Sequence, residues 1–151
     1  MERELKTLIK TLQHSYEKNA WHGPAVKEVL EGVTATDALK RLPNSHSIIE
    51  LVAHMTAWRI FVVKKLHGNS EYKVTDEMNF PTPTDWVKTL EELDASQQRL
   101  LEALKDFDSS KLYEPVPHGS YNYNFYTLLH GIIHHDLYHA GQIVLLKKQT
   151  I

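Results

Sequence analysis

Four long stretches of this chain repeat apolar residues at intervals of three and four, the spacing that lines one face of an α-helix. They span residues 2–20, about 48–67, 84–105 and 125–148, with long connections over about 69–83 and 106–124. No segment alternates apolar and polar residues over the length of a β-strand. We therefore predict an all-α four-helix bundle with an interrupted first helix and long connections, a fold that places metal sites between facing helices.

The ends of the helices carry residues that cap or break helical structure. Residues 21–24 contain a glycine and a proline and interrupt the first helix, because proline lacks an N–H and glycine is a poor helix former. Two short helical segments are expected after this break, at 25–30 and 36–42. Ser47 and Glu50 fit a capping box, which predicts that the second long helix begins after Ser47.

The length and charge of the chain limit its organisation and its partners. At 151 residues it is most simply one domain over 1–151, long enough to bury its own core. The formal net charge of −2 provides no basic field for nucleic acid. The first residues are charged, and no apolar segment has the length of a signal peptide or the roughly 20 residues of a membrane span. We expect a cytoplasmic protein without nucleic-acid or membrane partners.

The chain contains no cysteine. This excludes disulfides, thiolate metal ligands and a cysteine nucleophile. Histidine and carboxylate are therefore the strong metal donors that remain.

Four histidines crowd into the last predicted helix, at positions 130, 134, 135 and 139. An α-helix advances about 100° per residue, so His135, His139 and Gln142 fall within about 60° of one another, on the same side as an apolar stripe that faces the core. His130 and His134 form a second pair that lies roughly 100–140° away and faces a groove or a subunit interface. The helix thus offers two candidate metal-binding pairs, and the core-facing one is favoured.

A third ligand is expected from another helix, because a catalytic zinc-like site uses three protein ligands and an open position. His54 lies on the apolar face of the second long helix, where an unpaired polar ring is costly to bury. His14 and His22 are the other upstream candidates. The alternative for His54 is an ordinary hydrogen-bonded core histidine. The remaining histidines lie near expected loops and are predicted to be exposed: His46, His67 and His118.

Residues 135–139 also match the spacing of the zincin motif His-Glu-x-x-His, with Asp136 in place of the glutamate that acts as general base. Aspartate is one methylene shorter, so its reach to a metal-bound water is reduced. The strands that a zincin normally carries are not predicted here. Protease chemistry is therefore disfavoured.

Three segments together resemble the DinB-like superfamily of metal-binding four-helix bundles, also called YfiT-like. The matching text is Trp-His-Gly-Pro at 21–24, residues 45–58 with His54 and Trp58, and His-Asp-Leu-Tyr-His-Ala-Gly-Gln-Ile at 135–143. The resemblance implies that His54, His135 and His139 bind a divalent metal, commonly zinc or nickel. It also implies a homodimer.

For activity, the resemblance implies a thiol-dependent S-transferase or isomerase, since some similar proteins use bacillithiol, mycothiol or glutathione. A low-molecular-weight thiol at the open metal position loses its proton, and its sulfur then attacks a small electrophile. Because the chain has no cysteine, that sulfur comes from a cosubstrate. Gln142, Tyr138 and His22 are candidates to orient the substrate or the metal ligands, and Asp136 either supports a ligand or is exposed.

Two other function classes stay open at the level of sequence. The same metal can activate water, which makes the protein a metal-dependent hydrolase. Alternatively, the chain is a non-enzymatic module that binds a metal or small ligand, such as a stress-response sensor. No catalytic base is identifiable near His135, so no catalytic residue is assigned.

Overall fold

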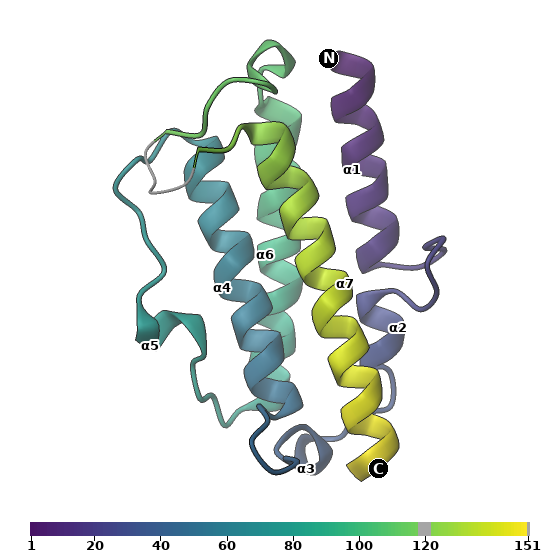
Figure 1. Cartoon of the computed structure of the whole chain (residues 1–151). Helices are drawn as coiled ribbons and strands as arrows, with labels where there is room; N and C mark the ends of the chain where they lie inside the picture. The colour runs from purple at the N-terminus through teal and green to yellow at the C-terminus, as the bar shows by residue number, and fades with distance from the viewer. Residues whose placement is uncertain (118–121, 151) are drawn as a thin grey trace.

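A computed structural model describes residues 1–117 and 122–150 of the protein. Its long helices pack side by side as a bundle (Figure 1). They are α1 (Glu2–Tyr16), α4 (Ile48–Leu66), α6 (Trp86–Asp106) and α7 (Phe125–Thr150). In the described part of the chain, the extended structure is limited to an isolated antiparallel bridge between Pro115 and Asn124. The predicted all-α bundle is confirmed.

The short elements are α2 (Val26–Leu30), α3 (Ala35–Ala38), α5 (Asp76–Asn79) and the 3₁₀ helix η1 (Ser109–Lys111). In Figure 1, α2 continues the column of α1 toward the C-terminal end of α7, so α1 and α2 together complete one side of the bundle. The interruption of the first helix is therefore confirmed.

Several helix ends differ from the sequence-based expectation. Helix α1 ends at Tyr16 rather than near residue 20, and Asn19 adopts a left-handed backbone with φ of 64°. Helix α3 spans Ala35–Ala38 and is shorter than the predicted 36–42. It ends early because a turn begins at Leu39, four residues before Pro43. The start of α4 is as predicted, since the Glu50 carboxylate accepts hydrogen bonds of 2.8 Å from both the N–H and the hydroxyl of Ser47.

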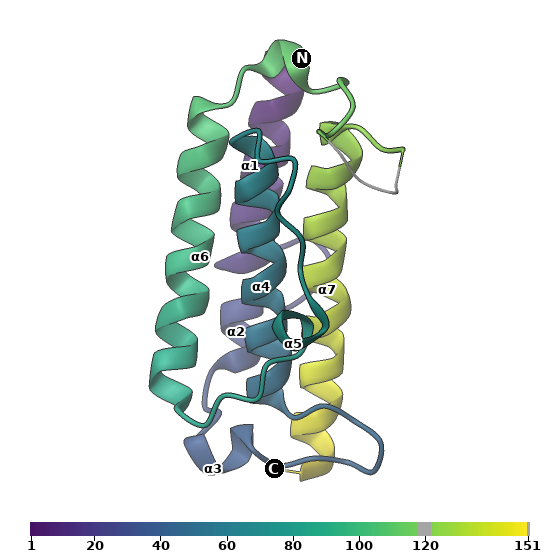
Figure 2. The same cartoon turned by 90° about the vertical axis from the view of Figure 1, so that its left-hand side faces the viewer.

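Helix α5 was not expected, because its four residues lie inside the predicted loop 69–83. The Thr75 hydroxyl caps it by accepting a hydrogen bond from the N–H of Met78. Figure 2 shows α5 lying across the gap between the ribbons of α4 and α7. Two contacts described below join this segment to α4.

Within the described ranges, the buried apolar residues form two clusters, one toward each end of the bundle. Between them, each of three helices carries a buried polar residue: Arg59 on α4, Gln97 on α6 and Asp136 on α7. Each of these lies between apolar neighbours that belong to opposite clusters. A polar layer therefore crosses the middle of the bundle, and we call these three residues the polar layer below.

No helix in the two described ranges is long and apolar enough to cross a membrane. The prediction for His118 falls outside the described residues.

Candidate metal centre

Three imidazoles converge between α4 and α7, next to the polar layer. His54 comes from the middle of α4, and His135 and His139 lie on successive turns of α7. The Nε2 atom of His135 lies 2.9 Å from His54 Nε2 and 3.1 Å from His139 Nε2. His54 and His139 are about 95% buried, while His135 is partly exposed. The structure thus brings together the three histidines that the sequence had placed in one cluster.

Hydrogen bonds at the far side of two rings fix which nitrogen carries the proton. His54 donates from Nδ1 to the backbone carbonyl of Asn79, and His139 donates from Nδ1 to the Gln142 side-chain oxygen at 2.6 Å. A carbonyl oxygen only accepts, so both rings hold their proton on Nδ1. Their Nε2 atoms therefore carry lone pairs that point toward His135.

Burial keeps these rings neutral. It lowers the pKa of His135 to about 3 and that of His139 to about 4, and charge on the neighbouring histidines acts in the same direction. Burial also lowers the pKa of His54. Neutral imidazole is the form that binds a metal ion, because a proton and a metal compete for the same lone pair.

The donor set fits a divalent metal ion. Imidazole nitrogens bound tetrahedrally to one zinc-like ion at about 2.0–2.1 Å lie roughly 3.3 Å apart, a few tenths of an ångström more than the 2.9 and 3.1 Å found here. The ligand atoms of the three histidines all lie within 4.8 Å of one another. The Nε2 atoms of His54 and His139 both carry lone pairs, so only His135 can place a proton between the three Nε2 atoms. One proton cannot form a full hydrogen bond to both lone pairs. A cation satisfies all three, so the cluster can hold a metal ion.

The segment of α5 covers the cluster through contacts that sequence reasoning missed. The Phe80 ring stacks on His54 with ring centres 4.0 Å apart, and His46 stacks on the other face of Phe80 at 3.8 Å. The Trp58 indole N–H donates to the Asn79 side-chain oxygen at 3.0 Å. Asn79 therefore connects two residues of α4, one by its backbone and one by its side chain.

Asp136 is fully buried, which corrects the expectation that it is exposed. Its carboxylate accepts a hydrogen bond of 2.7 Å from Arg59, and both side chains have no exposed surface. Burial raises the pKa of Asp136 to about 6, and the charge of Arg59 opposes that rise. Because this carboxylate is bound to a guanidinium, it does not occupy the position of a zincin general base.

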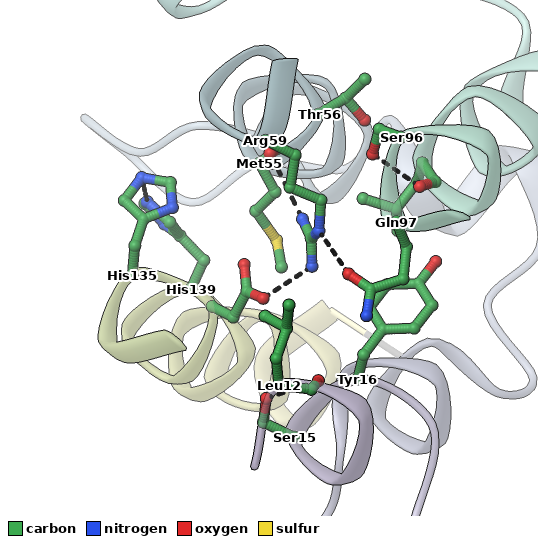
Figure 3. Close-up of polar contacts among 12 residues, drawn as sticks. Leu12, Ser15, Tyr16, Met55, Thr56, Arg59, Ser96, Gln97, His135 and His139 are labelled. Atoms are coloured by element: carbon green, nitrogen blue, oxygen red, sulfur yellow. Dashed lines mark hydrogen bonds and ion pairs between the residues drawn. The ribbon is translucent and has the colours of Figure 1, made fainter. Parts of the chain in front are cut away.

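Arg59 reaches from α4 into the centre of the bundle, where Figure 3 shows it between Gln97, Met55 and Tyr16. It donates to the Gln97 side-chain oxygen at 3.2 Å and to the Met55 carbonyl at 3.3 Å. Its guanidinium carbon lies 5.0 Å from the centre of the Tyr16 ring. The ion pair with Asp136 therefore fixes the rotation of α7 relative to α4, and with it the position of His135.

A sequence signal for this pair existed. Residues 51–63 contain one charged residue, Arg59, and residues 125–146 contain one, Asp136. A single charge inside a long apolar helix is costly to bury unless a partner of opposite charge meets it. Two such charges of opposite sign in adjacent helices indicate one buried ion pair.

The other candidate residues lie differently around the site. Tyr138 is 66% exposed, and its ring meets the edge of His139 with centres 5.1 Å apart. His22 and His14 are exposed, His22 in the loop between α1 and α2 and His14 on α1, and neither belongs to the cluster. On the other side of α7, His130 and His134 contact each other, with ring centres 5.8 Å apart.

Comparison with known proteins gave one match. A family model described as the DinB superfamily matches residues 20–143, which include both segments that supply the three histidines. Neither the curated proteins nor the solved structures gave a match to the chain.

Proposed function

The chain belongs to the DinB superfamily, and we propose that its three-histidine cluster binds one divalent ion, zinc or nickel, and transfers a low-molecular-weight thiol to small electrophiles. The observation that carries the proposal is the convergence of the Nε2 atoms of His54, His135 and His139. When bound, the metal supplies a Lewis acid that lowers the pKa of a thiol at its open position.

The charge of the cluster favours an anionic sulfur ligand. All three histidines are neutral, and no carboxylate is part of the cluster among the described residues. A divalent ion held by neutral ligands keeps its full double charge, which attracts a thiolate more strongly than a site with carboxylate ligands does. The chain has no cysteine to fill that position. The sulfur therefore comes from a cosubstrate.

The reaction forms one sulfur–carbon bond and breaks the bond between carbon and the leaving group. The leaving group departs with the bonding electrons, and the thiol proton passes to solvent. Asn79 and Gln142 orient the imidazoles through their hydrogen bonds to Nδ1. Phe80 covers one face of His54 and keeps water from that side.

The hydrolase is the second candidate, since a metal at three histidines also activates water. It is less favoured because the acidic residue nearest to the cluster along α7, Asp136, is bound to Arg59 and does not belong to the group of candidate ligands. We also propose, from the family resemblance, that the protein is a homodimer. Light scattering then gives twice the 17.5 kDa mass of one chain.

Turnover assays with single histidine variants test the proposed activity. The protein is loaded with zinc or nickel and mixed with 1-chloro-2,4-dinitrobenzene and bacillithiol, mycothiol or glutathione. We expect turnover that needs both metal and thiol, that is lost in His135→Ala and that is kept in His134→Ala, the exposed neighbour on the same helix. Turnover of an ester substrate without thiol supports the hydrolase instead, and no turnover in any combination supports a binding module.

A further inference from the structure

An apolar cavity of about 260 Å³ opens between α4 and α7 directly beside the histidine cluster. The residues that line it include Trp58, Phe61, Leu128, Gly131, Ile132 and His135. His135 also belongs to the metal-binding cluster, so the cavity and the cluster share one side chain. Any molecule in the cavity therefore lies next to the candidate metal position.

We propose that this cavity binds the apolar, uncharged part of the electrophile, and that the thiol cosubstrate lies outside it. That the bound molecule is an electrophile rests on the proposed function. The site itself, a cavity for a small apolar group, stands on the geometry described next.

The lining selects against charge. Of the described residues that line the cavity, none is Lys, Arg, Asp or Glu. A charged group that enters such a site loses its hydration without gaining an ionic partner, which is costly. Bacillithiol, mycothiol and glutathione are polar molecules, and the first and last are charged. The cavity therefore suits the other reactant.

Aromatic side chains form one wall. Trp58 and Phe61 are partly exposed, and their rings pack edge to face with centres 5.3 Å apart. Trp58 also lies 6.0 Å from the His135 ring, centre to centre, and its N–H is held by Asn79. Small-molecule sites are typically lined by aromatic and apolar side chains with fixed positions and by few polar groups. The volume lies just below the roughly 300 Å³ at which drug-sized sites begin, so the bound group is small, such as a single ring.

Gly131 provides the room. It lies in the interior of α7, where glycine destabilises a helix relative to alanine. A Cβ atom built at Gly131 meets no other atom within 4 Å, so the space beside it is open. Gly131 lines the cavity and is itself exposed, so a side chain at this position adds bulk at the rim of the cavity.

Substitution of Gly131 tests the proposal without disturbing the histidines. Gly131→Leu is expected to narrow the cavity, and Gly131→Ala to narrow it less; both substitutions favour the helix, and the added Cβ has room. Gly141→Leu is the matched control, because Gly141 is likewise exposed on the same helix with open space around it but does not line the cavity. Circular dichroism melting checks that all three variants fold.

Binding is first measured by NMR titration of the metal-free protein with 4-nitrotoluene and with 4-nitrobenzoate, which differ in charge. We expect wild type and Gly141→Leu to bind 4-nitrotoluene equally and at least ten times more tightly than 4-nitrobenzoate. Gly131→Leu binds 4-nitrotoluene at least ten times more weakly, and Gly131→Ala lies between. Equal binding in Gly131→Leu and wild type, or equal binding of the two probes, overturns the proposal.

Kinetics of the metal-loaded protein then separate this inference from the proposed function. Gly131→Leu is expected to raise the KM for 1-chloro-2,4-dinitrobenzene at least tenfold and to leave the KM for the thiol unchanged. Turnover with an unchanged KM for the electrophile overturns the inference and leaves the transferase intact. Selective binding of 4-nitrotoluene without any thiol-dependent turnover overturns the transferase and leaves the apolar ligand site intact.

Discussion

Replacing Asp136 by asparagine removes one charge from the centre of the bundle and nearly preserves the side-chain shape. Both partners of the ion pair are fully buried, and their atoms lie 2.7 Å apart. Breaking a buried pair by removing one partner costs about 3–5 kcal/mol, because the other charge stays buried without compensation. Arg59 keeps its hydrogen bonds to Gln97 and to the Met55 carbonyl, so we expect the lower end, about 3 kcal/mol.

The assay is urea unfolding of the metal-free protein at pH 7. With a urea dependence of about 1–3 kcal/mol per molar, a loss of about 3 kcal/mol lowers the midpoint by roughly 1–3 M. Removing the exposed Lys6–Glu2 pair by Lys6→Ala is the control and leaves the midpoint unchanged.

A double variant shows whether the cost comes from the unpaired charge. Arg59→Met with Asp136→Leu removes both charges and fills the space with apolar groups, so it is expected to be more stable than Asp136→Asn alone. A cost below about 1 kcal/mol for Asp136→Asn would refute the claim that a desolvated ion pair holds the polar layer. A double variant less stable than Asp136→Asn would refute the reasoning as well.

Three further predictions concern the histidine cluster. Gln142→Leu removes the acceptor of His139 Nδ1–H and is expected to weaken metal binding about 10–100-fold, measured by competition with a chelator; unchanged affinity contradicts a role for Gln142 in orienting the ring. Phe80→Ala uncovers His54, so the pKa of His54 in the metal-free protein should rise toward 6.5, as followed by NMR titration; a constant pKa contradicts the covering role of Phe80. The folded-state pKa values of His135 and His139 lie below their unfolded values, so the unfolded chain binds more protons in acid, and the stability of the metal-free protein should fall from pH 7 to pH 4. The double variant His135→Leu/His139→Leu should lose less stability over this range in urea unfolding, and an equal loss contradicts the assignment.

Much of the fold, and the grouping of the three histidines, could be predicted from the helical spacing of residues in the sequence. The spacing of His135 and His139 on one helix face, and of His54 on the apolar face of another, is a local property that 3.6 residues per turn determine. The capping residues of α4 are equally local. These features could be predicted because each depends on residues within a few turns of one another.

The features that sequence reasoning missed depend on contacts between distant segments. Helix α5 has only four residues, and an isolated helix of that length is not stable in water. It forms where Asn79 and Phe80 meet His54 and Trp58, more than 20 residues away along the chain. Periodicity within the loop carries no sign of these contacts.

The burial of Asp136 was missed for a related reason. A one-stripe interpretation of α7 gives the helix a single buried face, but this helix packs against α1, α2 and α4 and is buried on more than one side. Asp136 lies about 100° from His135 around the helix, so an interpretation with a single buried stripe predicts that Asp136 faces solvent. Only the pairing of two isolated charges, Arg59 and Asp136, pointed to the buried contact.

The metal content of purified protein tests the central claim most directly. After saturation with zinc or nickel and removal of excess ion, elemental analysis should give one ion per chain in wild type and in His134→Ala. It should give none in His54→Ala and none in His135→Ala. Absence of bound metal in wild type, or one ion per chain retained in His54→Ala, would contradict a metal site built from His54, His135 and His139.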